Sequence, residues 1–442
     1  MRASLAKYFL YYPALLLRGE PVLRHLASYE ASQWWRPEEL KRYQEQRLER
    51  LLAHAITHCA HYARTLTTSD ANAFASQPFL TKQLLRDQKA ALISAAKPAF
   101  LHEKTTGGST GQAVTLVKTR EALARERAAT WRAYRWAGVD IGDPQGRFWG
   151  VPFARKDRLR HRLIDLVNNR VRLSAFDFNE AALERYFVRL CRFKPKYLYG
   201  YVSVLSAFAQ WLDASGKRLP FPLASVIATS EVLAPPVRAL LARVFETRVF
   251  NEYGCGEVGS IAHECEAGKL HLMAENLLVE TLVDDRPART GERAEIVVTE
   301  LNNQAMPLIR YRLADFTEGP PRTGCACGRG LPFISGIAGR AYDMVKLPDG
   351  RAFHGEFFLY IFENLKREGR RLNQFQVVHE APTRIKVLLV AAPEEIAQAT
   401  VALRTAIHAG MGSEIEVLVE RVSDIARQPS GKLLLVKGLA GS

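Results

Sequence analysis

Residues 196–251 decide the fold class, and they read KYLYGYVSVLSAFAQWLDASGKRLPFPLASVIATSEVLAPPVRALLARVFETRVFN. Short apolar runs alternate here with longer amphipathic ones, which predicts strands alternating with helices. The expected strands are Lys196–Leu198, Ser225–Thr229 and Thr247–Asn251, and the expected helices are Val202–Ala214 and Pro235–Phe245. This alternation is typical of α/β layers with parallel strand pairing.

The same alternation extends toward the N-terminus and stops further along the chain. Upstream, strands are predicted at Val114–Lys118 and Phe148–Val151, and helices at Glu121–Trp136 and Glu180–Leu190. After Gly268 we expect strands without intervening helices, at Asn276–Leu282, Glu292–Thr299 and Leu308–Tyr311. The predicted fold is therefore α/β, with layered sheets and helices and a β-rich subdomain closing the large N-terminal domain.

Three regions are expected along the chain. Residues 1–100 form a helical N-terminal region of the large domain, in which Pro37–Ala63 has helical periodicity, and residues 101–340 form its core. The polar, turn-rich segment Gly339–Asp349 precedes a small α+β C-terminal domain, residues 341–442. In that domain we expect strands at Phe375–His379, Arg384–Val390 and Glu414–Val419 and a helix at Glu394–His408.

Composition narrows the class of protein. The chain has 442 residues, of which 48% are hydrophobic and 24% charged, which excludes collagen-like and wholly disordered chains. Six cysteines in this length do not form a disulfide scaffold and suggest the reducing cytoplasm. The net charge of +15 favours anionic partners such as nucleotides, coenzyme A or acidic lipid. Nucleic acid is not expected, because the basic residues are dispersed.

The N-terminus carries one apolar run, Tyr8–Leu17, which Pro13 interrupts. Ten residues are too few to span a bilayer, which needs about 20, and no small-residue cleavage site of a signal peptide follows. Arg2, Lys7 and Arg18 flank the run, so it could rest on a membrane surface as a peripheral contact. The alternative is a helix packed on the main body.

The first chemical motif is Thr105-Thr106-Gly107-Gly108-Ser109-Thr110-Gly111-Gln112. Glycines and hydroxyls just before a strand make a loop rich in hydrogen-bond donors, which can surround phosphate oxygens. It is not a Walker loop, because no Gly-Lys-Ser/Thr ends it. A surface turn is the alternative interpretation.

The second motif is Asn251-Glu252-Tyr253-Gly254-Cys255-Gly256-Glu257-Val258-Gly259. It contains Gly-x-Gly-x-x-Gly after a strand, but a dinucleotide-binding fingerprint should open a long helix, and Cys265 and Gly268 soon interrupt any helical pattern. Tyr253 is better interpreted as a stacking ring, and Glu257 as a carboxylate that faces a metal ion.

Two further motifs are weak when taken alone. In Arg310-Tyr311-Arg312-Leu313-Ala314-Asp315, the aspartate could accept two ribose hydroxyls or simply end a salt-bridged strand. In Gln428-Pro429-Ser430-Gly431-Lys432, a turn presents one lysine that could neutralise phosphate charge.

In this order and spacing, the four motifs resemble the AMP-forming adenylate superfamily of acyl-CoA synthetases. The likeness is greatest to its phenylacetate–CoA ligase and capsular-polysaccharide-biosynthesis branch, and it runs through nearly the whole chain. Further matching segments are Pro78–Lys82, Tyr199–Ser203, Thr229–Glu231, Asn302–Pro307 and Gly339-Arg340 with Asp343. Ala305–Arg312 and Cys325–Pro332 resemble the capsular branch in particular.

The resemblance implies roles for individual residues. Thr105, Thr106, Gly107, Gly108, Ser109, Thr110 and Gly111 would bind the ATP phosphates, and Ser230, Glu231, Asn251, Tyr253, Gly254 and Asp315 the rest of the nucleotide. Glu257 would hold Mg²⁺, and Arg340 would contact the nucleotide beside a hinge at Asp343. Lys432 would stabilise adenylate formation and then swing away as the small, mobile domain rotates.

Three residues depart from the family pattern. Gln112 replaces a usual lysine, Ala314 a usual glycine, and Gly256 a usual Thr or Arg. The implied activity is an ATP-dependent carboxylate ligase that forms an acyl-adenylate and pyrophosphate and passes the acyl group to coenzyme A. One alternative is an amide ligase acylating an amino sugar or amine in surface-polysaccharide synthesis. The other is a non-catalytic nucleotide-binding scaffold, which Gln112 and Ala314 favour and which the intact Glu257, Asp315 and Lys432 oppose.

A separate set of residues has metal-ligand spacing: Cys265, His271, Cys325 and Cys327. Cys-x₅-His and Cys-x-Cys could supply four tetrahedral ligands to a structural zinc ion. The alternative is a group of buried thiols beside a tight turn. His263 competes for the fourth position, and Cys255 lies outside the set.

Overall fold

The computed structural model describes residues 1–96, 101–105, 114–149, 155–175, 180–337, 345–349, 351–353, 355–368, 370, 372–425 and 436–438. Its largest element is an eight-stranded sheet in the order β14-β9-β8-β7-β6-β5-β3-β4. The strands are β3 Gln145–Trp149, β4 Arg170–Ser174, β5 Tyr197–Tyr201, β6 Ser225–Thr229, β7 Val249–Cys255, β8 Gly259–Glu264, β9 Leu270–Leu272 and β14 Phe333–Ile334. Pairing is parallel from β4 to β7 and antiparallel beyond β7, which confirms the predicted α/β class.

Helices cover both faces of this sheet. They are α8 Arg120–Trp136, α9 Arg155–Val167, α10 Glu180–Phe193, α11 Val202–Ala214 and α12 Pro235–Phe245. Alternate residues of β5 and β6 point to opposite sides, as a period of two requires. Leu198 and Val226 pack in the same apolar cluster as α10–α12, whereas Tyr199 and Ile227 pack with Tyr134 of α8. Strands buried on both faces explain the continuous apolar runs of the sequence.

A second, antiparallel sheet follows in the order β11-β10-β12-β13. It comprises β10 Leu277–Val283, β11 Arg286–Pro287, β12 Arg293–Glu300 and β13 Tyr311–Glu318, and a separate hairpin joins β1 Leu101–Thr105 to β2 Thr115–Thr119. The expected strand Leu308–Tyr311 is wrong, because β13 begins only at Tyr311. Arg310 has a positive φ of 46° just before it, and its buried guanidinium pairs with Glu280.

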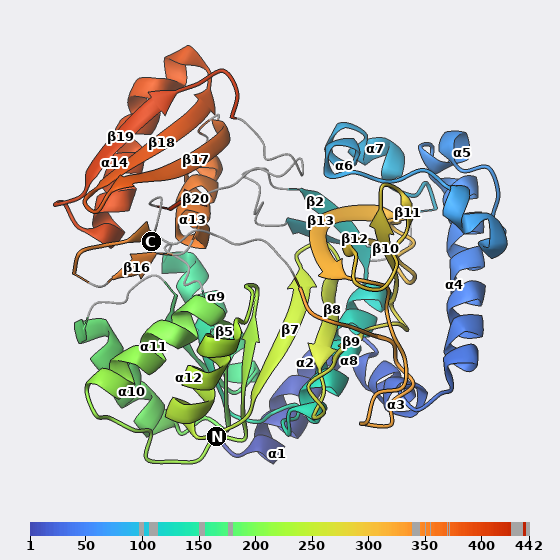
Figure 1. Ribbon diagram of the computed structural model, residues 1–442, viewed down its shortest axis with the longest axis horizontal. Helices are drawn as coiled ribbons and strands as arrows, with labels where there is room; N and C mark the ends of the chain where they lie inside the picture. The colour runs from blue at the N-terminus through green and yellow to red at the C-terminus, as the bar shows by residue number, and fades with distance from the viewer. Residues whose placement is uncertain are drawn as a thin grey trace.

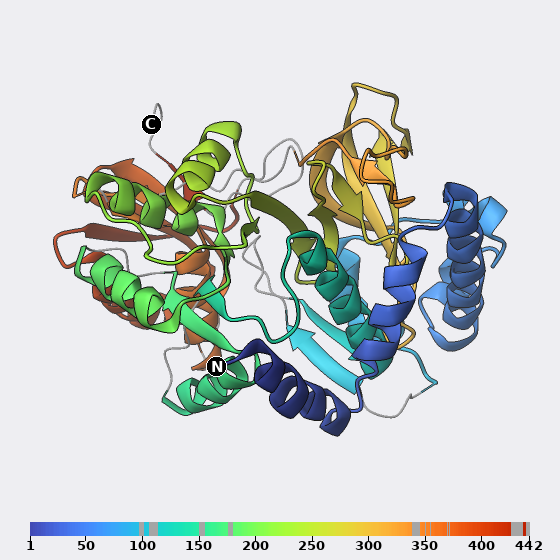
Figure 2. The ribbon, with the colours of Figure 1, turned by 90° about the horizontal axis from the view of Figure 1, so that it is seen from below.

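The N-terminal region is helical, with α1 Ala3–Leu5, the π-helix η1 Ala6–Tyr11, α2 Tyr12–Leu17, α3 Val22–Ser32, α4 Pro37–His58, α5 Tyr62–Thr65, η2 Ala71–Ser76, α6 Lys82–Asp87 and α7 Lys89–Leu92. Helix α4 begins at Pro37 as expected, with a capping box through Glu39. It ends at His58 rather than Ala63, because Cys59 is extended. Helices α3 and α8 lie side by side (Figures 1 and 2). No helix in the described part of the chain is long and apolar enough to cross a membrane.

The C-terminal part is α+β. Its elements are β15 Val345–Lys346, β16 Ala352–Phe353, α13 Gly355–Arg367, β17 Leu372–Ala381, β18 Arg384–Ala391, η3 Pro393–Glu395, α14 Ile396–Met411, β19 Glu416–Arg421 and β20 Val436–Lys437. The sheet order is β19-β18-β17-β20. In Figure 1 this sheet lies at the upper left, above helices α10–α12, and the β10–β13 sheet lies to its right, between it and helix α4. One apolar cluster includes both Phe375 of β17 and Phe148 of β3.

Candidate nucleotide site and thiol cluster

One cavity of about 350 Å³ lies where β6 and β7 end, and we call it the nucleotide cavity. Its lining contains seven residues that the sequence predicted to bind a nucleotide or its metal ion: Ser230, Glu231, Asn251, Tyr253, Gly254, Glu257 and Asp315. They come from three motifs that are far apart in the chain. The carboxyl ends of parallel strands meet at one edge of a sheet, which is where α/β folds bind ligands.

The Gly-x-Gly-x-x-Gly motif forms the β7–β8 hairpin and opens no helix, so it is not a dinucleotide fingerprint. Gly254 faces its partner strand so closely that a Cβ atom would lie 2.6 Å from the carbonyl oxygen of Gly259. Gly259 has a φ of +79°, which favours glycine. The hairpin places Tyr253 and Glu257 on the nucleotide cavity.

Three carboxylates of the nucleotide cavity are held by neighbouring side chains or backbone groups. The backbone N–H and hydroxyl of Ser203, at the start of α11, donate to Glu231 at 2.5 and 2.8 Å. The Tyr253 hydroxyl donates to Asp315 Oδ2 at 3.0 Å. The guanidinium of Arg238 donates two hydrogen bonds to Glu264, at 2.9 and 2.7 Å. These contacts fix the carboxylates in place around the cavity.

Glu257 is held less tightly than those three. Its Oε1 lies 3.7 Å from Lys82 Nζ and 3.5 Å from the hydroxyl of Tyr311. Both distances exceed those of a good hydrogen bond. A carboxylate with such long contacts has lone pairs that can ligate Mg²⁺, which prefers oxygen.

Two residues of this region have strained backbones. Ser230 has a φ of 69°, and Ala314 has a φ of 56°. The left-handed region costs a residue other than glycine roughly 1 kcal/mol or more. This geometry explains why glycine is usual at the position of Ala314, and it shows that alanine is accommodated there.

Buried Glu252 and partly buried Cys255 also line the nucleotide cavity, and neither was predicted from the sequence to have a role there. Burial raises the pKa of Glu252, although Tyr199, Arg147 and Tyr134 favour its charged form. Burial also raises the pKa of the Cys255 thiol well above its usual range. The sequence analysis likewise missed Arg238 and Glu264, because their pairing joins α12 to β8 and no local motif marks it.

Several predicted site residues lie outside the described part of the chain: Thr106, Gly107, Gly108, Ser109, Thr110, Gly111, Gln112, Arg340, Asp343 and Lys432. Thr105 is described and ends β1, where its hydroxyl lies 3.2 Å from that of Thr115. It is not part of the cavity lining described above.

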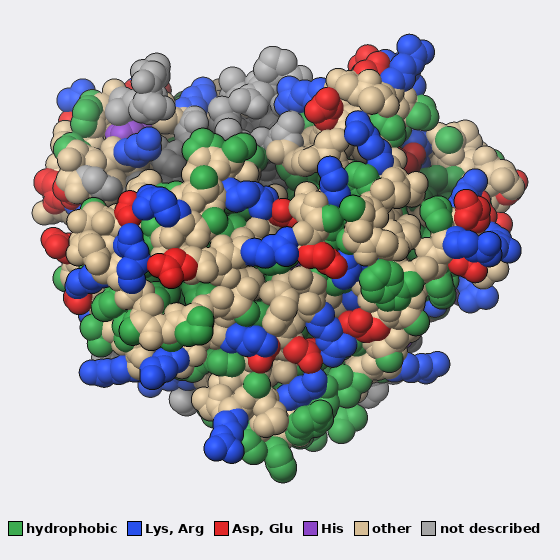
Figure 3. Space-filling model, turned by 60° about the horizontal axis from the view of Figure 1, so that its bottom comes forward, with side chains coloured by type: hydrophobic (Ala, Val, Ile, Leu, Met, Phe, Trp, Pro, Cys, Tyr) green, Lys and Arg blue, Asp and Glu red, His purple; other side chains and the backbone are tan. Residues whose placement is uncertain are grey.

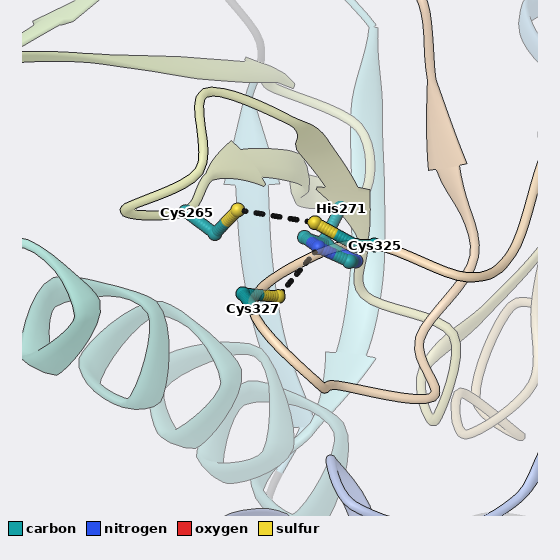
Figure 4. A group of neighbouring side chains, drawn as sticks. All are labelled: Cys265, His271, Cys325 and Cys327. Carbon is teal, nitrogen blue, oxygen red and sulfur yellow. Dashed lines mark hydrogen bonds between the residues drawn. The ribbon is translucent and has the colours of Figure 1, made fainter.

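A second site brings together the predicted metal ligands, and we call it the thiol cluster: Cys265, His271, Cys325 and Cys327. The four ligand atoms lie within 4.8 Å of one another. Figure 4 shows the β8–β9 hairpin supplying two of these residues, and the loop before β14 the other two. His263 is not in this group, and its Nδ1 instead contacts the carbonyl oxygen of Glu264.

The pKa values of the residues in the thiol cluster are shifted in different directions. Burial raises the pKa of Cys265 to about 12. The pKa of Cys327 is lowered despite burial, because the backbone and side chain of Arg329 donate hydrogen bonds to its sulfur. Burial lowers the pKa of His271 to about 4, so its imidazole is neutral at pH 7.

Comparison with known proteins gives two sequence relatives. Protein CapK of Staphylococcus aureus is 25% identical over 244 residues, which cover 54% of this chain and 53% of CapK. Phenylacetate-coenzyme A ligase of Thermus thermophilus is 24% identical over 328 residues, covering 70% of this chain and 72% of the ligase. The chain thus spans about half the length of CapK. No family model matches the chain.

Solved structures share the fold over most of the chain. 2-Hydroxyisobutyryl-CoA ligase, in complex with 2-HIB-AMP and CoA in the thioesterification state, covers 93% of this chain with a TM-score of 0.56 and 17% identity; the match spans 92% of that ligase. An open conformation of the same ligase gives a TM-score of 0.54 at 16% identity, with 89% and 90% of the two chains covered.

The chain therefore has the fold of the adenylate-forming ligases. Together with the two sequence relatives, this confirms the resemblance to the AMP-forming adenylate superfamily, and within it to the phenylacetate–CoA ligase branch.

Proposed function

We propose that this protein is an ATP-dependent carboxylate ligase. A carboxylate oxygen of the substrate attacks the α-phosphorus of ATP, pyrophosphate leaves, and an acyl-adenylate forms. The thiol of coenzyme A then attacks the acyl carbon, AMP leaves, and the thiol proton passes to solvent. The observation that supports this best is the nucleotide cavity, where seven residues from three separate motifs line one site in an adenylate-forming fold.

The proposal gives the described residues distinct tasks. Asp315, which accepts a hydrogen bond from Tyr253, also accepts hydrogen bonds from the ribose hydroxyls. Glu231 and Ser230 lie beside the adenine. Glu257 is the ligand for Mg²⁺, which offsets phosphate charge during adenylation. From the resemblance, the loop Thr105–Gly111 binds phosphates, and Arg340 and Lys432 act on the reacting nucleotide, with the hinge at Asp343. We place the reaction in the cytoplasm.

The test is ATP–pyrophosphate exchange with pooled aryl, aliphatic and amino acids. We expect exchange that depends on one of the pools. In Lys432→Ala the exchange rate should fall at least about 100-fold, because the lysine no longer neutralises the negative charge that develops on the phosphate in the transition state. ATP binding should remain in that variant. Exchange at the wild-type rate in Lys432→Ala would remove this lysine from the mechanism, and no exchange with any pool, in protein that binds ATP, would favour the scaffold alternative.

The acceptor is tested once the acid is known. Coenzyme A should be consumed in step with pyrophosphate release, measured as loss of free thiol. If coenzyme A is inert and an amino sugar instead yields an amide, the amide-ligase alternative is correct. The reason for including that arm is the resemblance of Ala305–Arg312 and Cys325–Pro332 to the capsular-polysaccharide-biosynthesis branch.

We also propose that the N-terminal helices contact an anionic membrane surface. They pack on the body through Tyr11, whose hydroxyl accepts a hydrogen bond from Trp131 at 2.8 Å, so packing is part of their role. Their outer face exposes Phe9, Leu16 and Leu17 at 72, 79 and 89%. Figure 3 shows hydrophobic side chains gathered at the lower edge of this face, with Lys and Arg nearby. Apolar and basic groups together suit an anionic lipid surface.

The membrane proposal predicts co-sedimentation with vesicles that contain anionic lipid, and less with purely zwitterionic vesicles. The double change Leu16→Ser and Leu17→Ser should weaken binding at least about tenfold. Val401→Ser, which alters an exposed apolar residue of α14, is the matched control and should bind as the wild type does. Equal binding by the double variant would exclude this surface.

A further inference from the structure

The thiol cluster takes no part in the proposed ligase reaction, yet its side chains are arranged like the ligands of a metal ion. Two of its turns have the same form, Cys265–Gly268 and Cys325–Gly328. In each turn the glycine N–H donates to the carbonyl oxygen of the first cysteine, at 2.9 and 3.0 Å. Both glycines have a positive φ, of 73° and 81°. The chain thus builds two equivalent cysteine turns that face each other.

The distances within the thiol cluster suit a tetrahedral zinc ion. Cys265 Sγ lies 3.7 Å from Cys325 Sγ, and Cys327 Sγ lies 3.3 Å from His271 Nε2. With Zn–S of about 2.3 Å and Zn–N of about 2.0 Å, tetrahedral geometry requires about 3.8 Å between sulfurs and about 3.5 Å between sulfur and nitrogen. A disulfide would require about 2.05 Å between sulfurs, and Cys265, Cys325 and Cys327 form none.

The surrounding groups orient the ligand atoms inward. The carbonyl oxygen of Leu331 can only accept, so His271 Nδ1 donates to it at 2.8 Å and Nε2 is left facing the sulfurs. Such a second hydrogen bond is typical of a metal-bound histidine.

We propose that the thiol cluster binds one structural Zn²⁺ ion through three sulfurs and His271 Nε2. Four protein ligands leave no open position, so the ion is structural rather than catalytic. This proposal does not depend on the ligase reaction.

The ion would fasten a weakly attached segment to the sheet. Strand β14 pairs with β9 through only two residues, Phe333 and Ile334. Directly after it, Ser335, Gly336 and Ile337 line the nucleotide cavity. A zinc ion in the thiol cluster would therefore stabilise the position of the segment that forms one wall of the nucleotide cavity.

The first test is the metal content of the purified full-length protein after dialysis against metal-free buffer. We expect about one zinc per chain by mass spectrometry. X-ray absorption should give three sulfur ligands at about 2.3 Å and one nitrogen at about 2.0 Å. Well under one equivalent, another metal such as iron, or a shell of nitrogen and oxygen alone would overturn the proposal.

The second test uses the pair Cys325→Ser and Cys327→Ser, with Cys191→Ser as the matched control. Cys191 lies on α10, outside the thiol cluster. The double variant should lose its zinc, and the control should retain it. If the double variant does not fold, the zinc content and absorption spectrum of the wild type still decide the proposal. Retention of stoichiometric zinc by a folded double variant would contradict it.

Discussion

The nucleotide cavity and the thiol cluster both include residues of the β8–β9 hairpin, and they differ in how their polar groups are satisfied. In the thiol cluster, the ligand atoms point at one another, and the carbonyl oxygen of Leu331 fixes the imidazole of His271. In the nucleotide cavity, the contacts of Glu257 with Lys82 and Tyr311 are long, and Ser230 and Ala314 have strained backbones. The arrangement in the thiol cluster suits a permanently bound metal ion, and that in the nucleotide cavity suits ligands that bind and dissociate in each reaction cycle.

The largest expected effect comes from the cavity side of this comparison. Glu257→Gln should lower ATP–pyrophosphate exchange at least about 100-fold, on the order of 3 kcal/mol, because the carboxylate ligand for Mg²⁺ is lost. The melting temperature should barely change, since the contacts of Glu257 are long. Glu394→Gln, an exposed carboxylate of the C-terminal part, is the control. An unimpaired Glu257→Gln enzyme would contradict the role of this residue.

The thiol cluster should respond in the opposite way. Removing its zinc, through Cys325→Ser with Cys327→Ser, should lower the melting temperature by about 5 °C or more, because binding free energy contributes to folding. Exchange per folded molecule should fall only a few-fold, through the loosened cavity wall. Thermal unfolding and exchange measured on the same preparation separate the two effects. A melting temperature equal to that of the Cys191→Ser control would refute this half of the comparison.

The smallest expected effect tests the strained backbone. Ala314→Gly removes the cost of a positive φ but gives the unfolded chain more freedom, so the two terms largely cancel. We expect the free energy of unfolding to change by at most about 1 kcal/mol, with exchange unchanged. Denaturant titration measures it. A decrease of more than about 2 kcal/mol in the free energy of unfolding would instead mean that the Ala314 methyl group makes stabilising contacts.

The sequence predicted the helices and parallel strands around the nucleotide cavity well, and the reason is local. Val202–Ala214, Ser225–Thr229 and Pro235–Phe245 have the predicted bounds, because a proline at a helix start and fully buried strands leave clear patterns. The helix α9 and strand β4 were missed. Helix α9 is rich in basic residues, and its arginines are good helix formers although they leave little apolar periodicity.

Site residues were predictable where one motif carries them, and not where distant elements meet. Tyr253 and Glu257 belong to a single hairpin, so the motif revealed both. The bonds from Ser203 to Glu231 and from Arg238 to Glu264 join residues 28 and 26 positions apart, which no spacing rule specifies. Sequence also left His263 and His271 as rivals for the fourth metal ligand. The pairing of β14 with β9, with Phe333 opposite His271, places the loop that carries Cys325 and Cys327 beside His271, whereas His263 lies one strand further away.

The most direct test of the central claim is a crystal structure of the protein with AMP bound. The account predicts AMP in the nucleotide cavity, with the ribose hydroxyls on Asp315 and the adenine beside Tyr253 and Glu231. The phosphate should face Glu257. Nucleotide bound at any other site, with the nucleotide cavity empty, would contradict the account.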